Sequence, residues 1–285
     1  MSTIATTPGP AATSTPHLTP ISWPLRAWLG VEVMFGVAAI ATIFLRPQDS
    51  ATNFAWPIKP DVMAATNGAF YISVSTIFVL AVLARHWEQV RVIVIPAIVF
   101  TATMLLTTFL HWDKFSVGTL PYYVWFASYL LPPPIFAGLY IWQQKRAAPV
   151  GAAPSQPLPA GRRSFLRING LLMTGVALLL YLAPALLQQI GPWDFTPLTA
   201  RTLCGWLLAT GLLQVSMAWE GDWPRVKLAV GMLIALPVAL LFQLFRFAGE
   251  VQWSNLALWA LLLDVGLVAL LVLYLWIKPP LLSAD

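Results

Sequence analysis

The stretch WPIKPDVMAATNG, from Trp56 to Gly68, recurs in outline as WDFTPLTARTLCG, from Trp193 to Gly205. Both copies begin with Trp-x-x-x-Pro and place a glycine at the same distance from the tryptophan. Further matches follow at nearly the same offset: Trp87-x-x-Val90-Arg91 with Trp223-x-x-Val226-Lys227, Trp125 with Trp259, and Leu-Tyr-Ile-Trp142 with Leu-Tyr-Leu-Trp276. This pattern predicts that the chain contains one structural unit twice.

The composition places both units in a membrane. Hydrophobic residues make up 59% of the chain and charged residues only 9%, against about 25% charged residues in soluble domains. Eight apolar stretches approach the roughly 17–25 residues that a transmembrane helix needs: 25–45, 62–83, 91–110, 122–142, 168–189, 198–219, 226–247 and 255–277. The prediction is an all-α membrane protein whose eight transmembrane helices form a parallel tandem repeat of two four-helix bundles. The repeat is parallel because each unit has an even number of spans.

Low-complexity segments flank the two repeats. The predicted domains are a disordered cytoplasmic tail (1–20), the first repeat (21–146), a cytoplasmic linker (147–162), the second repeat (163–279) and a short cytoplasmic tail (280–285). The linker is rich in Ala and Pro, and we expect it to be semi-extended and to bury nothing. Within the spans, Pro96, Pro184, Pro237 and the run 132–134 predict kinks or local unwinding.

The distribution of positive charge predicts the orientation. Of the 16 Lys and Arg residues, eleven lie on the side that holds both termini and the linker, and five on the other side. Cytoplasmic loops carry the excess of Lys and Arg. Both termini are therefore predicted in the cytoplasm, with the protein in the plasma membrane of a bacterial cell. The positive charges need no nucleic-acid partner, and the expected partners are the lipid bilayer and another membrane protein.

Ionisable residues inside the spans are the candidate site residues, because burying a charge in the membrane costs about 2.5–3.5 kcal/mol or more. Arg201, Arg246 and Asp264 are all present in the second repeat, whereas the first repeat has apolar residues at the aligned positions. This shared asymmetry predicts one buried cluster of two arginines around Asp264. The cluster is either an anion or proton site, or a structural ion network that locks three helices together.

Four more polar residues in the spans are secondary candidates: Glu32, Asn67, Gln214 and Gln243. The single cysteine, Cys204, excludes an intrachain disulfide and cysteine-based metal clusters. The histidines are too far apart to ligate one cofactor together, so neither a cofactor nor a metal is predicted.

The aromatic–Pro loop, the glycine in the following helix, and the turn Asp222-Trp223-Pro224-Arg225-Val226 resemble an uncharacterised family of bacterial polytopic membrane proteins. The resemblance covers residues 190–250 and, more faintly, 53–115. It implies no known activity.

No arrangement of residues indicates an enzyme, since the sequence offers no nucleophile with a base, no metal site and no acid–base pair. The favoured hypothesis is a non-enzymatic membrane subunit or partner-binding bundle, because the extramembrane segments are too small to act alone. The alternative is a transporter or small-ligand permease that uses the predicted Asp264 cluster.

Overall fold

The computed structural model describes residues 18–281, and this part of the chain is helical with no β-strand. Eight helices are long and apolar enough to cross a membrane, which confirms the predicted number of spans. The first four spans are α1 (Trp23–Ala39) continued by the π-helical segment η1 (Ile40–Phe44), α3 (Asp61–Leu83), α4 (Trp87–Leu110), and α5 (Leu120–Leu130) followed by α6 (Pro132–Gln144). The last four are α7 (Ala160–Leu182), α9 (Pro197–Glu220), α11 (Ala229–Arg246) and α12 (Leu256–Ile277).

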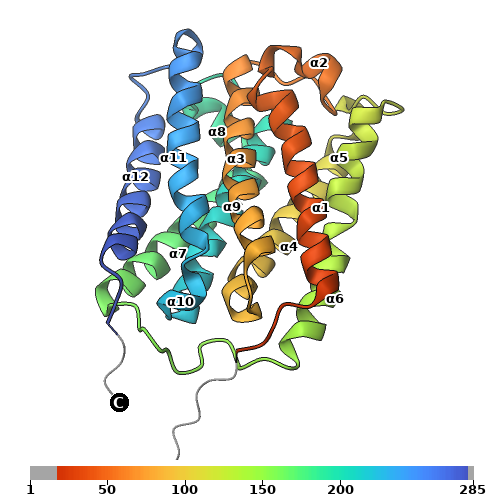
Figure 1. Cartoon of the computed structure of the whole chain (residues 1–285). Helices are drawn as coiled ribbons and strands as arrows, with labels where there is room; N and C mark the ends of the chain where they lie inside the picture. Colours follow the sequence, from red (N-terminus) through yellow and green to blue (C-terminus); the bar gives the residue numbers. More distant parts are fainter. Residues whose placement is uncertain (1–17, 282–285) are drawn as a thin grey trace, which may run out of the picture.

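Short helices lie between the spans: α2 (Ser50–Asn53), α8 (Pro184–Ile190) and α10 (Trp223–Val226). Most of the predicted tail 1–20, and residues 282–285 of the second tail, lie outside the described residues. The chain at the start of α1, the connection from α6 to α7 and the end of α12 all lie at the same end of the molecule (Figure 1).

The prolines inside the spans act in two ways. The fourth span breaks at Leu131, immediately before the proline run, and α7 ends before Pro184, so the predicted interruptions occur at both places. Pro96 and Pro237, by contrast, lie inside the continuous helices α4 and α11. A proline removes one backbone hydrogen bond without necessarily ending a helix whose two halves are held by neighbours.

Two central helices, α3 and α9, organise the packing (Figure 1). The most extensive contacts of α3 are with α1 and α11, and those of α9 are with α7 and α4. Helices from the two halves of the sequence therefore pack directly on each other. The close approach of α3 to η1 requires a glycine at position 68, because a Cβ atom on Gly68 would lie 2.6 Å from the Cα of Phe44.

The same backbone pairing occurs twice at the end of the molecule where the described chain begins. The segment before α1 pairs with the turn between α3 and α4 through Ile21 N to Arg85 O (3.1 Å) and Trp87 N to Thr19 O (2.7 Å). The segment before α7 pairs with the turn after α9 through Leu158 N to Gly221 O and Trp223 N to Gln156 O, both 2.9 Å.

An arginine in the first turns of the following helix strengthens each pairing. Arg26 of α1 donates to the carbonyls of Val82 and Ala84 at the end of α3. Arg163 of α7 donates to the carbonyls of Ala218 and Trp219 at the end of α9. The two halves therefore share these contacts as well as the sequence pattern.

Candidate functional site

A cavity of about 260 Å³ opens among the spans. Its walls come mainly from α1, α3, α4 and α5 of the first half, and three residues of α9 and one of α11 complete it. The lining is largely apolar, and the polar groups in it are few: Glu32, Thr42, Asn53, Tyr71, Thr101, Ser128 and Tyr129. Small-molecule sites are typically concave and apolar with a few polar groups that orient the ligand.

Glu32 is the acidic residue of this cavity. It lies nine residues after the start of α1, or about 13–14 Å along the helix, which places it near the middle of a hydrocarbon core about 30 Å thick. Glu32 is only 7% exposed, and its Oε1 atom is buried with no hydrogen-bond partner in the described chain. Gly36 and Ala39 follow on the same face of α1 and also line the cavity. A carboxyl group at this depth with an unused acceptor is a candidate ligand-binding group.

Close helix packing fixes the position of Glu32. A Cβ atom at Gly36 would overlap the Oγ of Ser75 and lie 3.3 Å from its Cβ, so glycine allows α1 to approach α3 one turn beyond Glu32. Small residues at such contacts are a general feature of membrane helix packing.

Aromatic side chains form the inner wall of the cavity. The hydroxyl groups of Tyr71 (α3) and Tyr129 (α5) are hydrogen-bonded to each other. The ring of Trp206 packs against Phe100 with centroids 4.0 Å apart, and Trp125 packs against Tyr129 with centroids 4.3 Å apart. These contacts hold several aromatic rings in fixed positions around the cavity.

Asn67, one of the secondary candidates, is hydrogen-bonded to an aromatic residue of this wall. Its side-chain oxygen accepts a hydrogen bond of 3.1 Å from the Nε1 of Trp206. Asn67 therefore orients a lining residue, although it does not itself line the cavity.

Three lining residues of the cavity are exposed: Ala38 on α1, and Leu120 and Val124 on α5. These two helices make few contacts with each other, so we infer that the mouth of the cavity lies between them. Leu120 is 75% exposed. Both helices are long and apolar enough to cross a membrane, and an opening between two spans faces lipid.

The π-helical segment η1 lies beside the cavity, and its Thr42 is a lining residue. Two of the predicted candidates hold the end of this segment from α11. Gln243 Nε2 donates to the Phe44 carbonyl at 2.8 Å, and Arg246 donates to the carbonyls of Phe44 and Leu45 at 2.9 and 3.0 Å. π-Helical turns are rare and often lie at functional sites. Side chains of the second half therefore hold the end of the first span, beside the cavity.

The predicted cluster of Asp264, Arg201 and Arg246 is not found among residues 18–281. Arg246 binds the end of η1, and Arg201 donates to His111 Nε2 at 2.7 Å. Asp264 forms no ion pair in the described chain, and its Oδ2 is buried without a hydrogen-bond partner. The prediction failed because it assumed contacts within the second half. Instead α9 places Arg201 beside the end of α4, and α11 packs against α3.

His111 lies just beyond the end of α4, outside the span. Burial lowers the pKa of this histidine below its usual value, and the positive charge of Arg201 lowers it further. The neutral imidazole can then accept the hydrogen bond from Arg201.

Asp264 has different neighbours, which form a second polar group inside the membrane. It lines a very small cavity of about 10 Å³ together with Gln214 of α9. Asn169 of α7 donates to the Gln214 side-chain oxygen at 3.0 Å and also interacts with Asp264. Of the predicted polar residues, Asp264 and Gln214 are therefore brought together. The space beside them has room for about one water molecule.

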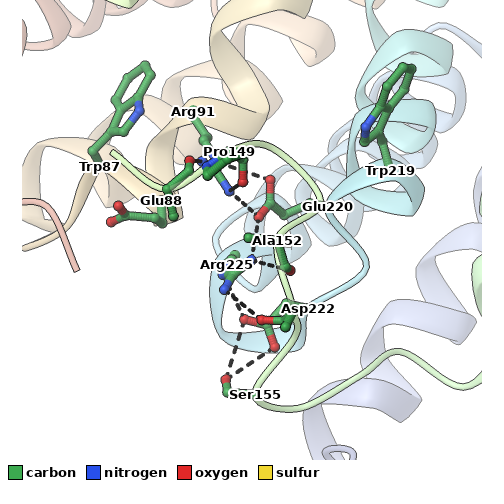
Figure 2. Close-up of polar contacts among 12 residues, drawn as sticks. Trp87, Glu88, Arg91, Pro149, Ala152, Ser155, Trp219, Glu220, Asp222 and Arg225 are labelled. Atoms are coloured by element: carbon green, nitrogen blue, oxygen red, sulfur yellow. Dashed lines mark hydrogen bonds and ion pairs between the residues drawn. The ribbon is translucent and has the colours of Figure 1, made fainter. Parts of the chain in front are cut away.

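A buried ion network lies at the end of the molecule where the linker runs (Figure 2). Glu220 at the end of α9 binds Arg91 of α4, with 3.0 Å from Nε to Oε2, and Arg225 of α10, with 3.1 Å from Nη1 to Oε1. Arg225 also binds Asp222 at 3.0 Å. All four side chains are buried. Two positive and two negative charges balance, so the network joins both halves without a free charge.

The same arginines hold the linker. Arg91 donates to the carbonyls of Ala148 and Pro149, and Arg225 donates to those of Ala152 and Ala153 (Figure 2 labels Pro149 and Ala152). The expectation that the linker buries nothing is wrong, since Leu158 is also buried. A proline-rich segment has fewer backbone N–H groups than carbonyls, and the carbonyls left unpaired suit guanidinium donors.

Sequence reasoning missed the cavity and Glu220. The one signal for Glu220 was an acidic residue at the end of a span whose aligned position in the first repeat is apolar. Comparison with protein-family models, curated proteins and solved structures gave no match.

Proposed function

We propose that this integral membrane protein binds a lipophilic small molecule in the cavity between α1 and α5, and that the molecule enters from the lipid. The observation that carries the proposal is a carboxyl group, Glu32, with an unused acceptor inside a largely apolar cavity that is open toward the membrane. The proposal shares a small ligand with the transporter or permease alternative, but it places the site in the first half instead of at the Asp264 cluster.

The hypothesis of a non-enzymatic subunit that binds another membrane protein stays a prediction. A subunit that serves only as a docking bundle needs no internal cavity, whereas a ligand-binding protein does. The ligand-binding function is therefore favoured by a feature that the subunit hypothesis does not use.

Filling the cavity should weaken binding. Ala97 of α4 lines the cavity, so we expect Ala97→Phe to weaken binding of an apolar probe such as phenylbutanol at least tenfold. The matched control is Ala102→Phe, since Ala102 lies on the exposed face of the same helix and does not line the cavity. Titration of the purified protein in lipid nanodiscs, followed by tryptophan fluorescence, measures both. Equal affinities in the two variants would contradict the proposal.

We also propose that the chain is a parallel tandem repeat. The sequence matches, the paired backbone hydrogen bonds before α1 and α7, and the shared arginine contacts of Arg26 and Arg163 support it. The two repeats would be related by an axis near the membrane normal. Because α3 contacts α11 and α9 contacts α4, the repeats exchange contacts across that axis.

The proposed location is the plasma membrane with both termini in the cytoplasm. A reporter that is active only in the cytoplasm should be active when fused within 147–160 or after Lys278. It should be silent when fused near Asp49 or Asp113. The positive-inside count is the reason for this expectation, and activity at Asp49 and Asp113 alone would reverse the orientation.

A further inference from the structure

Glu32 has no positively charged neighbour among the residues that line the cavity. Within residues 18–281, the lining includes no Lys, Arg, His or Asp, and its remaining titratable groups are Tyr71 and Tyr129. These two hydroxyl groups are bonded to each other, and Glu32 forms no ion pair in the described chain. The protein therefore supplies an acid inside the membrane but not the positive charge that would compensate a carboxylate.

The aromatic wall suits a positive charge. The faces of Trp and Tyr rings attract ammonium groups within about 6 Å, most strongly where water is excluded. Trp125, Tyr71 and Tyr129 line the same cavity as Glu32. Glu32 lies close enough to Tyr129 for the two to interact electrostatically. A carboxyl group beside several aromatic rings is complementary to an organic cation.

We propose that the ligand is a lipophilic amine, bound as an ammonium with its charge beside Glu32 and its apolar part against the rings. This inference rests on the ligand-binding function proposed above and names the class of ligand. A volume of about 260 Å³ lies slightly below the range of about 300–1,000 Å³ that is typical of ligand pockets, so the ligand is small.

Binding would also move one proton. An unpaired carboxylate in the membrane is costly, so Glu32 holds a proton when the cavity is empty. A neutral amine that enters from the lipid accepts this proton: the O–H bond of Glu32 breaks, an N–H bond forms on the amine, and an ammonium–carboxylate ion pair remains.

Phenylbutylamine and phenylbutanol test the proposal, because they share an apolar part and differ in the group that meets Glu32. Each is titrated into the full chain in nanodiscs, as wild type, Glu32→Gln and Asp264→Asn. Asp264→Asn is the matched control, since it neutralises an acid of the other half that does not line this cavity.

We expect the wild type to bind the amine about tenfold more tightly than the alcohol, a difference within the range of charge-assisted and cation–π contacts. Glu32→Gln should remove this preference by weakening the amine alone, and Asp264→Asn should keep it. Equal binding of amine and alcohol to the wild type would refute the cationic class while leaving the ligand-binding function in place. A preference that survives in Glu32→Gln would refute the role of Glu32. Failure of both compounds to bind would refute the ligand-binding function itself.

Discussion

Replacing Glu220 by alanine should lower the free energy of unfolding by about 3–5 kcal/mol, the usual cost of breaking a buried ion pair from one side. The change leaves Arg91 buried without its carboxylate and deprives Arg225 of one of its two acidic partners. Thermal or denaturant unfolding of the protein in detergent measures the loss. The matched control is Asp113→Ala, which breaks a fully exposed pair with Lys114 and should leave stability unchanged.

The cost of losing Glu220 comes from the stranded charges. A double variant, Arg91→Met with Glu220→Met, should therefore be less destabilised than the sum of the two single variants. Additive effects would contradict the role that the structure gives to this network.

The second large effect concerns the contact between α7 and α9. A Cβ atom at Gly170 would lie 2.6 Å from the carbonyl oxygen of Gly211, and backbone cannot move away as a side chain can. We expect Gly170→Ala to destabilise the protein by about 1–3 kcal/mol, the usual cost of overpacking.

Gly175 on the same helix is the control for Gly170. A Cβ atom there would meet nothing within 4 Å, so Gly175→Ala should be neutral or stabilise the helix by up to about 1 kcal/mol. The unfolding temperatures of the two variants give the comparison. A destabilisation of the same size at both positions would show that it is caused by the loss of a glycine and not by the close contact at Gly170.

Composition was enough to predict the eight spans. An apolar stretch of this length forms a helix in lipid because its backbone N–H and C=O groups find no water there and must pair with each other. The breaks at Leu131 and before Pro184 were also predictable, since proline acts through its own ring and missing N–H. Pro96 and Pro237 show the limit of this reasoning. Whether a helix continues past a proline depends on neighbours that the sequence does not name.

The candidate site was predicted only in part. Glu32 stood out as an acid in a span, but the cavity beside it is built by six of the eight spans, from both halves. Comparing the repeats showed that Arg201, Arg246 and Asp264 were unusual, and it could not show which helices would be neighbours. Cross-packing of α3 with α11 and of α9 with α4 separates these residues.

The most direct test of the central claim is chemical labelling of Glu32 by a lipid-soluble carbodiimide, read by mass spectrometry of the peptides. Such a reagent adds to protonated carboxyl groups that it can reach from the membrane. The account predicts that Glu32 is modified in the wild type, is protected when phenylbutylamine occupies the cavity, and is unmodified in Ala97→Phe. Labelling of Glu32 that neither the ligand nor the Ala97→Phe substitution reduces, or labelling of Asp264 with none at Glu32, would contradict it.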